Sequence, residues 1–152
     1  MSTPLGPPQI PTLQTSYPHL LAEDTIVWTR WLRTNIHRIQ AVWYDVHVGL
    51  PVTLLPGLHP SMLADTQAIS RKRIDVVARA GPEIWVIEVK PYGTYTALGQ
   101  ALVYSRLFTI EYNPGQPTIP MVICCAMDPD LVADCQRLGV RYEEVGYPPY
   151  RL

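Results

Sequence analysis

Two apolar segments decide the fold, residues 73–80 (RIDVVARA) and residues 83–90 (EIWVIEVK), and only Gly81 and Pro82 separate them. Both segments are rich in branched apolar residues, which predicts two strands, and the two-residue connection predicts an antiparallel hairpin. The second segment is apolar for most of its length, so we expect it in the centre of a sheet. It nevertheless ends in the charged residues Glu88 and Lys90.

The surrounding patterns predict a mixed α/β (α+β) fold with a central sheet flanked by helices. Periodicity and chain breaks give the order α-β-β-β-α-β-α-β. The predicted helices are 20–36, 94–108 and 129–138, and the other predicted strands are 40–48, 119–126 and 140–145. Residues 49–70, with three prolines and two glycines, are predicted as a long connection. Five prolines in residues 1–18 predict an extended N-terminal arm, followed by a single domain over 19–152.

Composition narrows the class of protein. The chain has 152 residues, 47% of them hydrophobic and 16% charged, and a formal net charge of −1. This balance excludes a global basic field for nucleic-acid binding, so such binding would need a local patch. No apolar run approaches the length of a membrane span, and we expect no membrane association. The three cysteines, of which Cys124 and Cys125 are adjacent, favour a reduced, cytoplasmic setting over a disulfide framework.

Charged residues at the end of the central strand are the main chemical signal. Glu88 and Lys90 lie two residues apart, so their side chains share one face, with Cα atoms about 6.6 Å apart. Asp75 lies on the neighbouring strand between apolar residues. Buried charges are costly unless a metal, a partner charge or a substrate compensates them. Two carboxylates from adjacent strands suit Mg²⁺ or Mn²⁺, and a structural ion pair is the alternative.

These residues resemble a known pattern. Asp75, then Glu88-Val89-Lys90, then Gln100 and Tyr104 resemble the D…(D/E)-x-K…Q-x-x-x-Y pattern of the PD-(D/E)XK (restriction-endonuclease-like) nuclease superfamily, in its RecB-like branch. The likeness is close over residues 73–108. The element order extends it to about 20–126 and implies the αβββαβ core of that superfamily.

The resemblance implies a role for each matching residue. Asp75 and Glu88 would bind Mg²⁺ or Mn²⁺ with help from the Val89 carbonyl. Lys90 would orient or activate the attacking water or stabilise the transition state. Gln100 and Tyr104, one helical turn apart on one face, would contact the DNA backbone and support the catalytic centre. An ordinary helix face is the alternative for these two residues.

The first predicted helix and residues 72–73, at the start of the next predicted strand, carry further candidate residues. Glu23 on the first helix corresponds by position to an acidic residue that many members use as an additional metal ligand. A first-turn acid favoured by the helix dipole explains Glu23 equally well. A local DNA-binding rim is predicted from Arg30, Arg33, Lys72 and Arg73, with a solvated helix face as the alternative for the two arginines of the first helix.

The leading hypothesis is therefore a Mg²⁺-dependent deoxyribonuclease that hydrolyses phosphodiester bonds. A second hypothesis is a structural or DNA-binding component with a nuclease-like fold in a larger assembly, such as a phage particle or a DNA-processing complex. The near-neutral charge and the proline-rich arm favour it, because such arms often bind protein partners. A junction resolvase is the third, and the charge balance disfavours it because it would need a strongly basic face.

Overall fold

One mixed sheet forms the centre of the molecule. The computed structural model describes residues 2–51 and 71–147. Its strands lie in the order β1-β2-β3-β4-β5, with antiparallel pairing from β1 to β3 and parallel pairing from β3 to β5. The strands are β1 (Ala41–Val48), β2 (Lys72–Ala80), β3 (Glu83–Gly93), β4 (Thr118–Met127) and β5 (Arg141–Glu144). This confirms the predicted mixed sheet and the predicted hairpin between β2 and β3.

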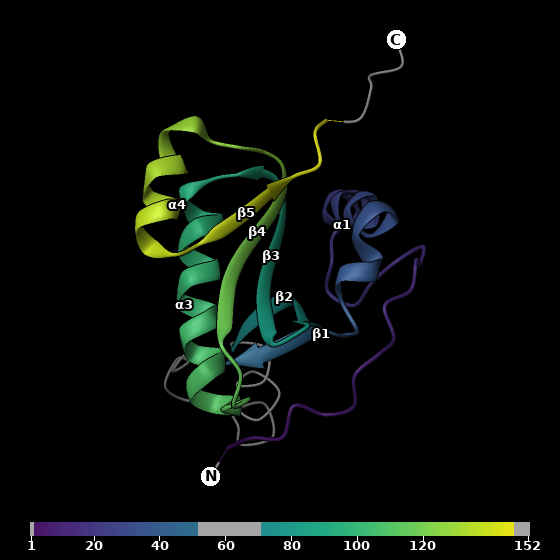
Figure 1. Ribbon diagram of the computed structural model, residues 1–152, viewed down its shortest axis with the longest axis vertical. Coiled ribbons are helices and arrows are strands. Elements are labelled where there is room, and N and C mark those ends of the chain that lie inside the picture. Colours follow the sequence, from purple (N-terminus) through teal and green to yellow (C-terminus); the bar gives the residue numbers. More distant parts are fainter. Residues whose placement is uncertain (1, 52–70, 148–152) are drawn as a thin grey trace, which may run out of the picture.

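Helices cover both faces of the sheet. Helix α1 (Ala22–Asn35) lies on one face, and α3 (Tyr95–Tyr112) and α4 (Val132–Leu138) lie on the other (Figure 1). Short 3₁₀ turns, η1 (Ile36–Arg38) and η2 (Pro129–Leu131), follow α1 and precede α4. Within the described residues no helix is long and apolar enough to cross a membrane. Most of the connection predicted at 49–70 lies outside the described residues.

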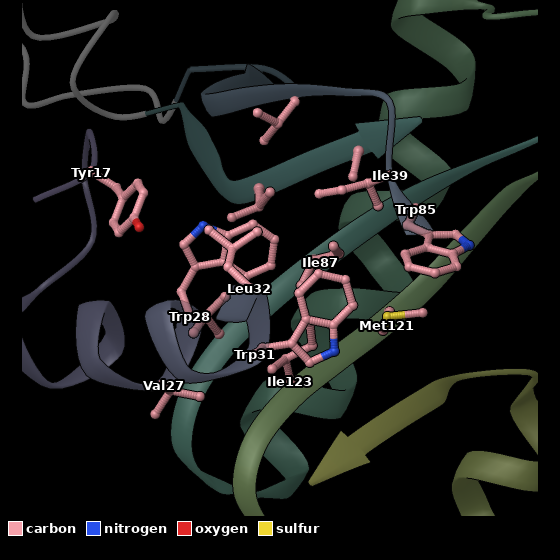
Figure 2. Packing of buried hydrophobic residues seen from close by; sticks show 14 of the residues in the cluster. Tyr17, Val27, Trp28, Trp31, Leu32, Ile39, Trp85, Ile87, Met121 and Ile123 are labelled. Carbon is pink, nitrogen blue, oxygen red and sulfur yellow. The ribbon is translucent and has the colours of Figure 1, made fainter. Parts of the chain in front are cut away.

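The face under α1 holds a core built on aromatic side chains. Trp28 and Trp31 project from α1 towards the sheet (Figure 2), and their rings stack with centroids 5.2 Å apart. Trp31 also meets Trp85 of β3 edge to face. The guanidinium of Arg38 lies 5.1 Å from the Trp85 ring centroid and pairs with Glu143 of β5. The Trp31–Trp85 contact holds α1 against β3, and the Arg38–Glu143 pair holds η1, the turn that follows α1, against β5.

Strand β3 continues past Pro91, where the sequence predicted its end. The Val89 N–H points towards β2, and in a strand the nitrogen of Pro91, two residues later, points the same way. The pairing of β2 with β3 has ended by then, at Val76 and Ile87. Proline therefore removes no ladder hydrogen bond, and pairing with β4 continues to Gly93.

The N-terminal arm lies along β1, the edge strand. Gln9 and Val42 exchange two backbone hydrogen bonds, of 2.8 and 3.0 Å, as an isolated antiparallel bridge. The indole N–H of Trp43 donates to the Gly6 carbonyl, and the ring of Tyr17, buried at the end of the arm, packs against Tyr44. The described part of the arm therefore belongs to the fold, and binding of a protein partner through it stays a prediction.

Two glycines should respond in opposite ways to alanine. A Cβ atom at Gly93 would lie 2.7 Å from Met127 Sδ and 3.1 Å from Met127 Cα, whereas one at Gly99, within α3, would meet nothing within 4 Å. We expect Gly93→Ala to lower the free energy of unfolding by about 1–3 kcal/mol through overpacking. Gly99→Ala should raise it by about 0.5–1 kcal/mol, because alanine favours the helix. Urea unfolding of both variants measures this, and equal effects would contradict the packing described.

Candidate active site

The site forms where β2 separates from β3. The last paired residues are Val76 and Ile87, so the next opposing pair would be Asp75 and Glu88. Both carboxylates are buried, with 4% of Asp75 and 2% of Glu88 exposed. Two acidic side chains are therefore buried among apolar strand residues at the point where the pairing of β2 with β3 ends.

Asp75 is held by its neighbours on β3. Its Oδ2 atom accepts a hydrogen bond of 2.9 Å from the Val89 N–H and lies 3.9 Å from the Lys90 ammonium nitrogen. Burial raises the pKa of Asp75, while the Val89 hydrogen bond and the charge of Lys90 oppose that rise. Asp75, Glu88 and Lys90 thus lie together, as the sequence predicted.

Among these groups, Glu88 has the most strongly shifted pKa. Burial, and then the charge of Asp75, raise the pKa of Glu88 well above its usual value, and Lys90 only partly offsets this. Its Oε1 atom is buried and has no hydrogen-bond partner among the described residues. A buried carboxylate oxygen without a partner is costly in the folded protein, and a bound cation or water at this atom would remove that cost.

Gln100 and Tyr104 lie on the face of α3 that adjoins the carboxylates. The Gln100 amide N–H donates to the Tyr104 hydroxyl at 3.5 Å, and Gln100 Oε1 is buried without a partner among the described residues. Burial, and then the charge of Glu88, raise the pKa of Tyr104, so its phenol keeps its proton. Both side chains can therefore offer hydrogen-bond donors to an anion beside the carboxylates.

The acid that α1 contributes to this cluster is Asp24. Glu23, chosen from the sequence, is exposed, whereas 4% of Asp24 is exposed and its charge interacts with Lys90 and Asp75. Burial raises the pKa of Asp24. The helical period of the sequence could have predicted that Asp24 is buried, because Asp24 falls on the same face of α1 as Val27, Trp28 and Trp31.

The predicted basic rim does not form as a set. The guanidinium of Arg30 donates to the carbonyls of Val145 and Gly146, and Arg73 forms a bidentate pair with Asp45. These two arginines are occupied within the protein. Arg33 and Lys72 are exposed, and neither has an ion pair with another described residue. Of the four basic residues, only these two have a charged group that no other residue in the described part of the chain binds.

The donor set suits a hard divalent cation that keeps several waters. Within 2–51 and 71–147, no three His, Cys, Asp or Glu side chains are arranged to enclose a metal. Mg²⁺ does not need such a cage, because one or two carboxylates with waters and substrate phosphate commonly hold it. Asp75 and Glu88 provide two carboxylates, and the unpartnered Oε1 of Glu88 is a free ligand atom. The residues present therefore fit Mg²⁺ or Mn²⁺.

Two solved structures are similar to most of this chain. The crystal structure of a repair endonuclease from Pyrococcus abyssi has a TM-score of 0.55 and 13% sequence identity, over 88% of this chain and 50% of that chain. The structure of an EndoMS–dsDNA2 complex has a TM-score of 0.50 and 14% identity, over 90% of this chain and 50% of that chain. This chain thus spans about half the length of each. No family model and no curated protein matches the sequence.

These similarities establish the class of fold. The mixed five-stranded sheet with helices on both faces is the α+β architecture expected from the sequence, and it is similar to the fold of the Pyrococcus abyssi repair endonuclease and of the protein in the EndoMS–dsDNA2 complex. At 13–14% identity the similarity is one of fold. The chemistry of this chain has to be argued from its own side chains.

Proposed function

We propose that this protein is a metal-dependent nuclease of the RecB-like kind that hydrolyses phosphodiester bonds of DNA. The observation that carries the proposal is the convergence of Asp75, Glu88 and Lys90 where β2 leaves β3, with the Glu88 Oε1 atom buried and without a hydrogen-bond partner among residues 2–51 and 71–147. The similarity of the fold to endonucleases supports it. Buried carboxylate oxygens usually have a hydrogen-bond partner, so the Glu88 Oε1 atom, on a side chain that interacts with a second carboxylate and an ammonium group, is a position where a bound cation would supply the missing interaction.

Each residue has a role that its surroundings allow. Asp75 and Glu88 would hold Mg²⁺, together with the Val89 carbonyl. A bound Mg²⁺ polarises a phosphoryl oxygen and lowers the pKa of coordinated water. The Lys90 ammonium, 3.9 Å from Asp75, would donate to the attacking water or to the phosphate, where negative charge grows. Gln100 and Tyr104, the Q-x-x-x-Y residues, would donate hydrogen bonds to the DNA backbone beside the carboxylates.

Binding of the DNA backbone away from the site falls to Arg33 and Lys72. Both are exposed, and their charges are not paired within the described residues. Arg30 and Arg73 would have to break existing contacts before they could bind phosphate. We therefore expect charge removal at Arg33 or Lys72 to reduce the salt dependence of DNA binding, by about one counterion per residue.

The experiment that tests the proposal combines metal binding with cleavage. Mn²⁺ is titrated calorimetrically into wild type, Asp75→Ala and Glu83→Ala, and the same samples are incubated with linear and circular DNA. Glu83 is the control because it begins β3, at the opposite end from Lys90. Wild type and Glu83→Ala should bind Mn²⁺ and cut, and Asp75→Ala should do neither. Absence of both in wild type would favour the non-enzymatic component of a larger assembly.

Asp24 and its neighbour Glu23 provide a matched pair. We propose that Asp24 supports the metal site from α1, so Asp24→Ala should slow cleavage by about 10- to 100-fold, the usual cost of losing an outer-shell partner of a metal site. Glu23→Ala, which removes an exposed carboxylate one residue away, should leave the rate within about twofold, as surface substitutions usually have small effects. Initial rates at saturating Mn²⁺ measure this. The reverse order would restore the assignment made from the sequence.

A further inference from the structure

Asp45 interrupts a strand pair beside the carboxylate cluster. Its φ angle is 56°, in the left-handed region that residues other than glycine rarely adopt and that a strand does not use. Strands β1 and β2 stay in one register on both sides of it, with no residue inserted. The flanking pairs are Tyr44 with Val76 and Val46 with Ile74. In this register Asp45 lies opposite Asp75, and the ladder skips that position.

The interruption changes which face the side chains cover. On the side of the interruption where β1 begins, Val42 of β1 and Val76 of β2 belong to the core under α1. On the other side, Val46 of β1 and Ile74 of β2 belong to the core that contains Phe108 of α3. A regular strand would keep residues of even number on one face. Both strands therefore rotate at the level of Asp45 and Asp75.

A charged pair fixes this rotation from the adjacent strand. The Nε and Nη2 atoms of Arg73 donate to the two carboxylate oxygens of Asp45, each at 2.6 Å. Arg73 precedes Asp75 by two residues on β2. The pair thus ties β1 to β2 next to the residue that leaves the ladder, with the fork geometry that suits arginine and a carboxylate.

Asp75 lacks a ladder partner on either side. Towards β1 the ladder skips it, and towards β3 the ladder begins only at Val76. We propose that Asp45 is a positioning residue: its left-handed backbone, held by Arg73, directs the Asp75 carboxylate to the Val89 N–H and the metal ligands. The consequence for metal binding rests on the proposed function, whereas the consequence for the Asp75–Val89 hydrogen bond does not.

Three substitutions separate the backbone from the charge. Asp45→Val removes the carboxylate and disfavours the left-handed backbone, because valine is β-branched. Asp45→Gly permits that backbone and removes the pair with Arg73. Asp45→Asn keeps the shape and also tolerates the left-handed region. Glu83→Gln is the control, because it weakens another bidentate arginine pair of the same sheet, with Arg141, away from Asp75.

Two measurements follow the position of Asp75. The hydrogen-exchange rate of the Val89 amide, measured by NMR, reports the hydrogen bond to Asp75 without any metal, and calorimetry gives the Mn²⁺ affinity. In Asp45→Val we expect faster Val89 exchange and an affinity lowered about 10- to 100-fold, as for loss of a residue that orients a metal ligand. Asp45→Gly should fall between this variant and wild type. Asp45→Asn should restore most of both properties, and Glu83→Gln should change neither.

The outcomes distinguish this inference from the proposed function. Unchanged Val89 exchange in a folded Asp45→Val protein overturns the positioning role, even if wild type binds Mn²⁺ and cuts DNA. If Asp45→Val does not unfold cooperatively, Asp45→Gly decides, and wild-type exchange and affinity in it overturn the role. If Val89 exchange follows the expected order but wild type binds no Mn²⁺, the positioning of Asp75 stands and the proposed function fails.

Discussion

Glu88→Gln is expected to abolish cleavage and, in the metal-free protein, to raise the thermal stability at pH 7. The rate should fall by at least about 10²–10³-fold, because the substitution removes a carboxylate that would bind the metal. The stability gain follows from the raised pKa of Glu88, which burial and then the charge of Asp75 produce. A carboxyl whose folded pKa is raised stabilises the fold while protonated, and this contribution is lost as pH rises through that pKa. Glutamine does not ionise, so the Glu88→Gln variant does not lose stability in this way as the pH rises.

Thermal unfolding in a chelator from pH 5 to pH 9 tests the stability effect. The Tm of wild type should fall relative to that of Glu88→Gln as the pH rises. Added Mn²⁺ should reverse the order, because it stabilises only the protein that binds it. Glu83→Gln is a control of opposite sign, since a hydrogen bond from Arg141 lowers the pKa of Glu83. That variant should be less stable than wild type throughout pH 5–9, because the contribution of Glu83 is lost only when the pH falls below the ordinary pKa of a glutamate. A pH profile equal to that of Glu88→Gln would contradict the assignment.

Trp28→Ala is expected to cause the largest loss of stability, about 3–5 kcal/mol, as for other large-to-small changes at fully buried aromatic residues. The side chain has no exposed surface, stacks on Trp31, and donates a 2.9 Å hydrogen bond to the Tyr44 hydroxyl. Its removal leaves a cavity in the cluster of Figure 2 and a hydroxyl without its partner.

Urea unfolding measures this loss, with Ile26→Ala on the same helix as the control. Ile26 is 53% exposed, so its truncation should change the free energy of unfolding by no more than about 0.5 kcal/mol. Buried aromatic residues normally contribute far more than about 1 kcal/mol. A loss below that value for Trp28→Ala would therefore show that the tryptophan cluster does not hold α1 on the sheet.

Local patterns predicted most of the fold because most of its elements carry their own signals. Two runs of branched apolar residues and the Gly-Pro pair between them predict the β2–β3 hairpin. The two-residue period of a strand predicts that Glu88 and Lys90 share one face. Helix α3 was expected to end at Phe108 but continues for another turn, until Asn113 adopts a left-handed conformation. The Asn-Pro pair at 113–114 was the available signal for that end.

The parts of the candidate site that could not be predicted depend on contacts between distant segments. Arg73 was expected to face DNA, yet Asp45, 28 residues earlier in the chain, occupies it. Arg30 binds carbonyls more than 110 residues away. Such pairs depend on how α1 and β1 pack against distant segments, and no periodic pattern in the sequence predicts them. Asp24 is different, because the helical period places it on the buried stripe of α1, whereas Glu23 is exposed, and which of the two acts at the site stays a prediction.

The bridge between the N-terminal arm and β1 has a consequence for the solubility of the protein. An uncovered edge strand offers unpaired N–H and C=O groups to the edges of other molecules, and this is a common route to aggregation. Here Gln9 occupies the backbone groups of Val42, and the prolines around it cannot donate hydrogen bonds to a further strand. At this bridge the arm covers the outer edge of β1 with a segment that is poor in further donors. Shortened forms without residues 2–16 would expose β1 and should aggregate more readily as their concentration increases.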